Sequence, residues 1–299
     1  MQTTGKNRKN AKWTILIVVV LAAVVLLVAY GDRLPELLHP TKPEGDCVSV
    51  HFLDVGQGSS VLIQSGKTGI LIDAGEAEYA DRVIGYIRRS GVKSLSLVVA
   101  THPHSDHIGA LAEVLRAVPT EKVVMPRLTQ ENVPASVSYE RLLETIRDRK
   151  IPLAAAKPGA AYELEHAALT ILGPLEQSSD LNNMSVVCRL EAFSTVFLLP
   201  ADAEKAAQED LLSAGANLHC DVLQTPHHGS HTAMNEAFLD AAHPQMAVIS
   251  CGKNNDYGHP HDDVLQYYRT HKIKVYRTDE DGTIIVSCYA DGYRVDTRQ

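Results

Sequence analysis

Apolar residues are distributed in three different ways along the chain: one long run, a proline-containing polar stretch, and then many short segments. In the third part, Val48, Val50 and Phe52 alternate with other residues, as in a half-buried strand. Short apolar segments indicate further strands at 60–64, 70–72, 95–100, 122–125, 168–172, 186–192, 195–199, 220–225, 246–250, 273–276 and 283–288. Helical patterns predict helices at 78–90, 108–117, 138–149, 203–214, 234–241 and 262–270.

This mixture predicts an α/β fold of the α+β kind. Strands outnumber helices, and the two kinds alternate without a strict order. We therefore expect two sheets with helices outside them, a four-layer αββα sandwich, rather than a doubly wound parallel sheet. We assign residues 47–299 to this domain.

The long apolar run predicts a transmembrane anchor before the domain. Residues 13–30 carry no charge and have an aromatic residue at each end, and such a helix just crosses a hydrocarbon core of about 30 Å. Residues 1–12 contain four basic residues and no acid, so we expect them to form a cytoplasmic tail, with the domain on the outer side of the cell membrane. A signal peptide is the alternative, although its apolar region is usually shorter, about 7–15 residues. Residues 31–46 contain three prolines and are interpreted as a linker.

Composition and charge change this picture only slightly. The formal net charge is −8, so the whole chain has no basic footprint for a nucleic-acid backbone. This argues against a processive nuclease, but it is compatible with an enzyme that holds phosphates through metal ions. The five cysteines are widely spaced and form no CxxC pair, which disfavours a zinc ribbon. We expect most of them to be buried thiols, with one disulfide left open if the domain is exported.

One short segment concentrates side chains that bind metals. The predicted strand at 95–100 is followed by THPHSDHIG, which contains His102, His104, Asp106 and His107. Imidazole nitrogens and carboxylate oxygens suit zinc and manganese. Polar loop residues can simply be solvated, but three histidines in so short a window are unusual. A turn before a helix can direct all four side chains to one point, so we predict a metal site here.

This segment resembles the HxHxDHxG motif of the metallo-β-lactamase superfamily. Three further segments match that family in order. Gly69–Gly75 (GILIDAG) resembles the strand that ends in a structural aspartate. Leu199–Asp202 resembles the strand end that supplies a metal-bridging aspartate, and Pro226–Ser230 the strand end that supplies the last histidine. The resemblance implies the αββα sandwich and a metal-dependent hydrolase.

Longer segments are similar to the C-terminal hydrolase domain of the ComEC/Rec2 DNA-internalisation competence proteins. They are HFLDVGQGSS (51–60), NNMSVV (182–187), HHGS (227–230), ISCGKNNDYGHPH (249–261) and RTDEDGTI (277–284). The resemblance covers about residues 47–288. It does not include the polytopic channel, because the chain has one apolar span. A second difference is Ser59, which stands where the family usually has an acid. We therefore expect no transport role.

The resemblance implies two divalent metal ions, Zn²⁺ or Mn²⁺, and assigns their ligands. His102 and His104 would hold the first ion, and Asp106 and His107 the second, which makes Asp106 a catalytic candidate. Asp202 would bridge both ions. The second set would be completed by His227 or His228, and the sequence does not decide which.

The first ion lacks one expected ligand. Many members of the superfamily supply a third histidine between the motif and the bridging aspartate. In this chain that interval contains only His166, in an unremarkable context, and residues 182–185 (NNMS) stand at the expected place. An asparagine or serine oxygen is a weaker ligand than imidazole, so we expect the first ion to be held more loosely, or to be manganese.

Other residues are candidates for positioning the ligands or for contacting substrate. Asp73 is expected to orient a ligand histidine or the metal-binding loop. Beneath the site, the loop with Asp54 and Gln57 contains two glycines that permit a tight path. His259 and His261 flank a proline and are candidates for substrate contact or leaving-group protonation, against a purely structural role. The remaining candidates near the metals or substrate are Asn183, Ser185 and Ser230.

We therefore interpret the chain as a binuclear metallohydrolase outside the cytoplasmic membrane. The first hypothesis is a phosphodiesterase or nuclease, with a nucleic acid as substrate and a link to DNA uptake. The second is an exported hydrolase that removes phosphocholine from teichoic acid, a cell-wall polymer. Its substrate could also be another ester, an amide or a lactone. The third is a non-catalytic metal-binding partner of a DNA-uptake apparatus. The intact HxHxDH segment disfavours the third, because a scaffold gains nothing from an open metal site.

Overall fold

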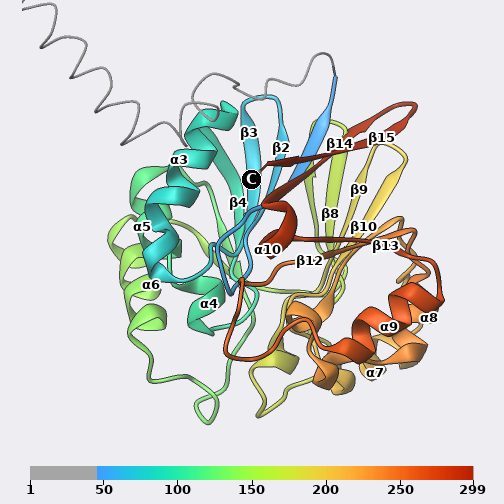
Figure 1. The fold of residues 1–299 in the computed structure, drawn as a ribbon. Coiled ribbons are helices and arrows are strands. Elements are labelled where there is room, and N and C mark those ends of the chain that lie inside the picture. The colour runs from blue at the N-terminus through green and yellow to red at the C-terminus, as the bar shows by residue number, and fades with distance from the viewer. Residues whose placement is uncertain (1–45, 299) are drawn as a thin grey trace, which may run out of the picture. The chain divides into compact units, whose positions relative to one another are not determined.

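Two β-sheets face each other in a computed structural model that describes residues 46–298 (Figure 1). The first sheet has eight strands in the order β15-β14-β1-β2-β3-β4-β5-β6, and the second has seven in the order β13-β12-β11-β10-β9-β8-β7. One apolar cluster lies between the two sheets. A second cluster lies between the first sheet and its helices, and a third between the second sheet and its helices. The described part of the chain therefore has the predicted αββα layers.

The first sheet combines antiparallel and parallel strands. Its strands are β1 (Val48–Phe52), β2 (Val61–Ser65), β3 (Thr68–Ile72), β4 (Ser94–Val99), β5 (Val123–Met125), β6 (Leu153–Ala155), β14 (Thr283–Tyr289) and β15 (Gly292–Arg298). Pairing is antiparallel from β15 to β3 and parallel from β3 to β6. The carboxyl ends of β3 and β4 consequently lie at the same edge.

The second sheet has a similar division. Its strands are β7 (Ala161–Leu164), β8 (Ala167–Ile171), β9 (Cys188–Ala192), β10 (Thr195–Leu199), β11 (Val222–Gln224), β12 (Met246–Ile249) and β13 (Lys274–Arg277). Pairing is antiparallel from β7 to β10 and parallel from β10 to β13. The loops that follow β10, β11 and β12 therefore leave the sheet at one edge.

Helices cover the outer face of each sheet (Figure 1). The first sheet is covered by α3 (Ala80–Ser90), α5 (Leu111–Ala117) and α6 (Val137–Asp148), and the second by α7 (Lys205–Ser213), α8 (Glu236–Ala242) and α9 (Asp262–Thr270). Shorter elements are α4 (Ser105–Ile108), α10 (Thr278–Asp281) and the 3-10 turns η2 (Ala77–Tyr79), η3 (Asn182–Met184), η4 (Pro226–Gly229) and η5 (His231–Ala233). α3 buries Val83, Ile84 and Ile87 on one face and ends at Gly91, whose left-handed backbone suits glycine.

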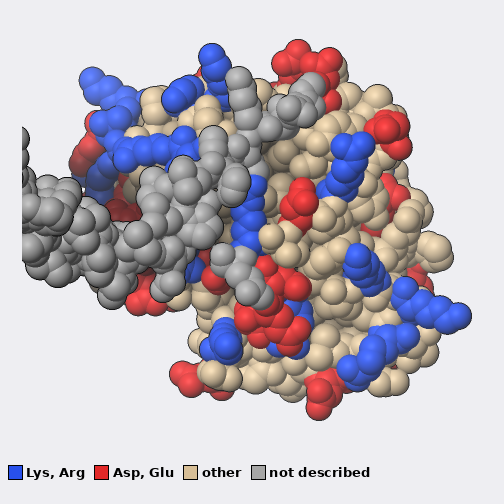
Figure 2. Space-filling view, turned by 45° about the horizontal axis from the view of Figure 1, so that its top comes forward, with Lys and Arg blue, Asp and Glu red and all other residues tan. Residues whose placement is uncertain are grey.

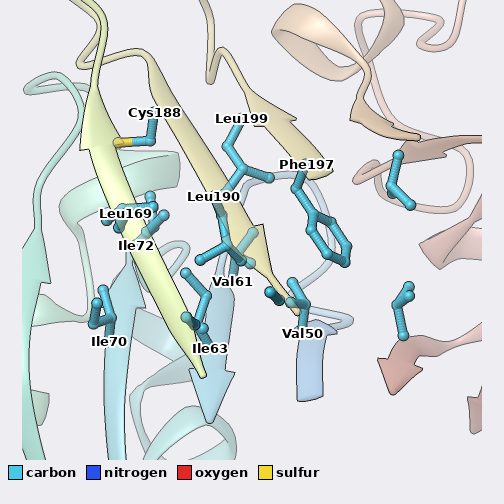
Figure 3. Close-up of a cluster of buried hydrophobic side chains, with 14 of the residues drawn as sticks. Val50, Val61, Ile63, Ile70, Ile72, Leu169, Cys188, Leu190, Phe197 and Leu199 are labelled. Carbon is cyan, nitrogen blue, oxygen red and sulfur yellow. The ribbon is translucent and has the colours of Figure 1, made fainter. Parts of the chain in front are cut away.

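The core between the sheets is built from the inward-facing residues of each strand. Val50 of β1 and Ile63 of β2 face Leu190 of β9 and Phe197 of β10 (Figure 3). All four side chains are fully buried. Because interiors of this kind pack as densely as organic crystals, the two sheets hold the loops at their edge in fixed positions.

The predicted elements agree with the structure except at the margins of the sheets. The strands β6, β7 and β15 were not predicted, and each forms an edge of its sheet. In β7 the burial alternates between exposed and half-buried, so the segment has no apolar run that would indicate a strand. The five cysteines are all buried and unpaired, which confirms the expectation of buried thiols.

The predicted membrane anchor lies outside the described residues. Residues 1–12, 13–30 and nearly all of the linker at 31–46 belong to the part that the structure does not describe. Within residues 46–298, no helix is long and apolar enough to cross a membrane. The anchor therefore stays a prediction from the sequence.

His51 makes the stability of the fold depend on pH. Its side chain is buried, and Nδ1 lies 2.9 Å from the Tyr86 hydroxyl. Burial, together with the charge of Arg298, lowers the pKa of His51 to about 3. Because the unfolded chain binds this proton near pH 6.5 and the folded chain does not, stability falls as the pH drops from about 6.5 toward 3, by about 2 kcal/mol at pH 5. His51→Leu should flatten the pH dependence of the unfolding free energy, measured by urea denaturation.

The exposed His271 provides a matched control for this experiment. His271→Leu should keep the wild-type slope of unfolding free energy between about pH 5 and pH 7. Equal slopes for wild type and His51→Leu would show that His51 does not carry the effect.

Candidate metal centre

The segments that carry the predicted ligands leave four strands at one edge of the sandwich. β3 is followed by Asp73, and its parallel neighbour β4 by residues 101–107. In the second sheet, β10 is followed by Asp202, and its parallel neighbour β11 by His227 and His228. Because carboxyl ends of parallel strands meet at one edge, residues distant in sequence come together here.

Four of these residues surround a common point. Asp106, His107, Asp202 and His228 each offer one ligand atom, and these atoms all lie within 4.8 Å of one another. Nε2 of His107 lies 3.3 Å from Nε2 of His228 and 3.1 Å from Oδ1 of Asp202. Oδ2 of Asp106 lies 3.3 Å from Nε2 of His228. Two imidazoles and two carboxylates form a donor set that suits zinc or manganese.

In both imidazoles of this cluster, a hydrogen bond from Nδ1 fixes the orientation of the ring. Nδ1 of His107 donates to Oδ2 of Asp73 at 2.7 Å, and Nδ1 of His228 donates to the carbonyl oxygen of Ser250 at 2.7 Å. The Nε2 lone pairs are therefore directed toward each other. Two such lone pairs at 3.3 Å repel unless a proton or a cation lies between them. The residues present thus fit a divalent metal ion.

The charges in the cluster also favour a cation. Burial opposes a charge on His107, but Asp202, Asp73 and Asp106 outweigh it and raise the pKa of His107 well above its usual range. In the same way, Asp202 and Asp106 outweigh burial and raise the pKa of His228 to about 10. A metal ion that binds here must displace protons from these imidazoles, so its affinity depends on pH.

A second set of donors adjoins the first, with the ring centroid of His102 4.2 Å from that of His107. Nε2 of His102 lies 3.1 Å from Nδ1 of His104 and 3.7 Å from Oδ2 of Asp202. Burial, followed by the charge of His107, lowers the pKa of His102, so this imidazole is neutral and can donate a lone pair. The Asp202 carboxylate approaches members of both sets, His102 at 3.7 Å and His107 at 3.1 Å, and the family resemblance implies a bridging role for this residue.

The structure separates the roles of His227 and His228. Both have a left-handed backbone, with φ of 48° and 56°, a conformation that costs non-glycine residues about 1 kcal/mol and that concentrates in functional sites. His228 belongs to the four-residue cluster. His227 lies outside it, with Nδ1 3.0 Å from Oε1 of Glu204 and Nε2 3.6 Å from Oδ2 of Asp202. The sharp turn therefore directs neighbouring histidines to different places.

Within the segment at 182–185, Ser185 and Asn183 support the site from outside the donor sets, whereas Asn182 lines the cavity beside them. Oγ of Ser185 lies 3.4 Å from Nδ1 of His102, behind the ring, and accepts from the backbone N–H of Asp202 at 3.2 Å. The Asn183 side chain accepts from the Ala207 N–H and donates to Asp180. Neither side chain points at the donor set of the first ion.

The loop after β1 lies against the metal-binding loop. The Ser59 N–H donates to the carbonyl oxygen of Asp106 at 3.0 Å. At Gly58, an added Cβ would lie 2.4 Å from the same oxygen, so a side chain there would push the two loops apart. Gln57 accepts from the Gly252 N–H at 3.0 Å, and its Nε2 lies 3.5 Å from Nδ1 of His259. The loop thus contacts the metal-binding loop through Ser59 and Gly58, and Gln57 connects it to Gly252 and His259.

A cavity of about 330 Å³ opens onto the donor sets. Its lining includes His104 of the second set, Asp106, Asp202 and His228 of the four-residue cluster, and the side chains of Gln57, Tyr257 and His259. Burial, and then the charges of His228 and His227, lower the pKa of His259 to about 4. His259 is therefore neutral near pH 7, which favours contact with substrate over protonation of a leaving group.

Three predicted residues lie away from this cavity. Asp54 pairs with Arg82 at 3.1 Å on the surface. Ser230 caps the η5 turn by accepting from the Thr232 N–H. Nδ1 of His261 accepts from the backbone of His231 at 3.1 Å. All three stabilise nearby loops.

Four contributors to the site escaped sequence reasoning. Thr101 donates to Asp73 at 2.6 Å and lies 3.1 Å from Nδ1 of His102, and Glu204 holds His227. Thr101 and Glu204 each stand next to a recognised motif, and this position in the sequence is the signal that could have identified them. Ser250 acts through its backbone carbonyl, which no side-chain identity reveals, and Tyr257 stands within the matching segment 249–261, close to His259.

Comparisons with known proteins indicate one family. The family model described as the Metallo-beta-lactamase superfamily matches residues 53–253. ComE operon protein 3 of Bacillus subtilis is 30% identical over 256 residues, which are 79% of this chain and 32% of that protein. Competence protein ComA of Neisseria gonorrhoeae is 29% identical over 265 residues, 88% of this chain and 35% of that protein. The chain spans about a third of the length of these relatives, which agree with the ComEC/Rec2 resemblance.

Solved structures show a similar fold at low sequence identity. The metallo-beta-lactamase fold protein YhfI from Bacillus subtilis aligns with a TM-score of 0.54 at 15% identity, covering 81% of this chain and 100% of that chain. CmlA, a diiron beta-hydroxylase from Streptomyces venezuelae, aligns with a TM-score of 0.53 at 13% identity, covering 86% and 55%. At these identities the likeness concerns the fold alone.

Asp73→Asn should weaken metal binding without removing a ligand. The amide nitrogen would face two hydrogen-bond donors, Thr101 and His107, so the Nε2 lone pair of His107 would lose its orientation. We expect the affinity for Zn²⁺ or Mn²⁺ to fall about 10- to 100-fold, measured by competition with a chelator. Circular dichroism of the same samples reports whether the variant is folded.

Asp54→Asn is the matched control, because this acid lies on the surface beside Arg82. It should bind metal as the wild type does. Equal losses in the two variants would show that the orientation of His107 by Asp73 is not what determines affinity.

Proposed function

The chain belongs to the metallo-β-lactamase superfamily, and on this premise we propose that it is a binuclear metal-dependent phosphodiesterase that acts on nucleic acid. The fold and the buried His/Asp cluster support a metal-dependent hydrolase. The finer proposal rests on one observation, the two donor sets that meet at Asp202 beside a single cavity.

The chain offers ligands for two ions. Asp106, His107 and His228 would hold one ion, His102 and His104 the other, and Asp202 would contact both. Both sets contain only nitrogen and oxygen donors, which suit Zn²⁺ and Mn²⁺. When bound, such ions supply positive charge that acidifies a water molecule and neutralises the oxygens of a transferring phosphoryl group.

Residues around the donor sets would position the substrate. His227 presents Nε2 beside Asp202 while Glu204 fixes its ring from the other side. His259, neutral near pH 7, can exchange hydrogen bonds with a phosphate oxygen or a leaving oxygen. Gln57 joins His259 to the loop beneath the metal centre and so limits the movement of that ring.

A nucleic acid is the substrate that the relatives favour, because ComA is described as a competence protein. The surface charge then constrains how the substrate is held. Figure 2 shows Lys and Arg side chains interspersed with Asp and Glu over the uncovered part of one face, without a continuous basic patch. The net charge of the whole chain is −8. Binding would therefore rest on contacts near the cavity, which suits a phosphodiesterase that takes short single-stranded segments better than a processive nuclease.

The full chain, purified in detergent, should hydrolyse single-stranded DNA and bis-p-nitrophenyl phosphate when Mn²⁺ or Zn²⁺ is supplied. Asp202→Asn should lower kcat/KM at least about a hundredfold, because it removes the carboxylate shared by the two donor sets. Metal content by mass spectrometry should fall in the same variant. Asp148→Asn, an exposed acid on α6, is the matched control and should retain activity.

Two outcomes would contradict the proposal. Undiminished hydrolysis by Asp202→Asn would exclude the metal centre as the active site. Hydrolysis of p-nitrophenyl phosphorylcholine without hydrolysis of DNA would replace nucleic acid by a cell-wall phosphocholine ester as the substrate.

We also propose that the domain faces the outside of the cytoplasmic membrane, on the basis of the apolar run at 13–30 and the basic residues before it. Alkaline phosphatase fused after Gln299 should then be active, and deletion of residues 13–30 should abolish that activity. A β-galactosidase fusion that is active at the same position would place the domain in the cytoplasm.

A further inference from the structure

The loop from Gly252 to Pro260 forms one wall of the cavity, and most of its internal hydrogen bonds involve the Asn255 side chain. Nδ2 of Asn255 donates to the carbonyl oxygens of Gly252 and His259, at 2.9 and 2.6 Å. Its Oδ1 accepts from the backbone N–H groups of Tyr257 and His259, at 3.2 and 3.0 Å. Four hydrogen bonds to one asparagine fix the direction of the loop, although most of its residues lie on the surface.

Tyr257 presents an aromatic ring to solvent beside the metal centre. It is 66% exposed, although it lines the same cavity as Asp106 and Asp202. Its ring lies nearly parallel to that of His259, at 20° and 5.5 Å between centroids, and His259 lies at 22° to His228. The orientation of the exposed ring is therefore tied to the metal cluster through two imidazoles.

A second hollow adjoins the first across His259. Its volume is about 540 Å³, and its cationic side chains are Lys253 and Arg277. Arg277 is engaged by Asp279 and Glu280. Within residues 46–298, no ion pair of Lys253 is found, so its ammonium is available to an anion from outside.

We propose that this loop is a nucleotide subsite, in which a base of the substrate strand stacks on Tyr257 and a neighbouring phosphate binds Lys253. This inference rests on the proposed phosphodiesterase function and names the part of the substrate that the site recognises. The loop carries an exposed aromatic ring and a cationic side chain that line two adjoining cavities. Aromatic rings and cationic side chains together are what proteins use to bind single-stranded nucleic acid without sequence preference. Stacking accepts any base, because every base has a π face.

The same features disfavour a choline group. Quaternary ammonium groups are bound by cages of several aromatic rings. Tyr257 is the only Phe, Tyr or Trp among the residues that line the two cavities in the described part of the chain, so they form no cage of several such rings. A phosphocholine ester would therefore gain little from this loop.

A cycle of substrate and protein changes tests the stacking. The full chain with Mn²⁺ is assayed on a single-stranded DNA oligonucleotide and on the same oligonucleotide with abasic sites in place of nucleotides. Tyr257→Ala should raise KM for the ordinary oligonucleotide about tenfold. Removing the bases from the substrate should raise the KM of the wild type by a similar factor. The variant acting on the abasic substrate should have a KM no higher than either single change produces. Tyr257→Phe keeps the ring and should restore the wild-type KM.

The phosphate contact has its own readout. Oligonucleotide binding, followed by fluorescence anisotropy, weakens with salt in proportion to the number of phosphate contacts. Lys253→Gln should reduce the slope of log affinity against log salt concentration by about 0.7. Lys67→Gln, an exposed lysine at a distant turn, should leave the slope unchanged.

Additive effects of Tyr257→Ala and base removal would overturn the subsite, as would a larger loss on p-nitrophenyl phosphorylcholine than on DNA. If wild type cleaves neither oligonucleotide, the proposed function fails, and the subsite is then judged from binding alone. In that binding experiment, equal affinities of wild type and Tyr257→Ala for the ordinary oligonucleotide would also overturn the subsite.

Discussion

The carboxylate of Asp73 is the constraint on which the metal centre depends. It is fully buried, and it accepts hydrogen bonds from the Thr101 N–H, the Thr101 hydroxyl and Nδ1 of His107. Because the hydroxyl of Thr101 gives its proton to Asp73, its oxygen can accept from Nδ1 of His102. One carboxylate thereby sets the ring orientation of a ligand in each donor set. A buried charge of this kind is tolerated only when it is fully hydrogen-bonded, so the strand ends around it cannot move independently.

The sandwich supplies positions, and the loops supply the chemistry. The same fold occurs in CmlA, whose description as a diiron beta-hydroxylase names a different reaction. The fold alone therefore does not decide what this chain does. The decisive features are the donor atoms on either side of Asp202 and the loop that carries Tyr257 and His259, because these residues determine which groups can approach the metal centre.

Much of this centre is visible in the sequence because its residues are local. The HPHSDH segment and the motifs around Asp73 and Asp202 each occupy a few consecutive positions at strand ends. The choice between His227 and His228 was open, since it depends on the left-handed backbone of two adjacent residues. Asp54, for which the sequence suggests a role in bracing its loop, accepts a hydrogen bond from the Gly56 N–H of that loop and also pairs with Arg82 on the surface. Tyr257 lies in the matching segment 249–261, but its place beside the cavity depends on how Asn255 folds the loop, which the sequence does not show.

The donor sets also join the two halves of the sandwich. His102, Asp106 and His107 follow a strand of the first sheet, whereas Asp202 and His228 follow strands of the second. An ion held by both groups acts as a cross-link at the edge where the sheets would otherwise separate, and its binding energy adds to the stability of the folded state. Metal supply would then set the lifetime of the protein as well as its chemistry.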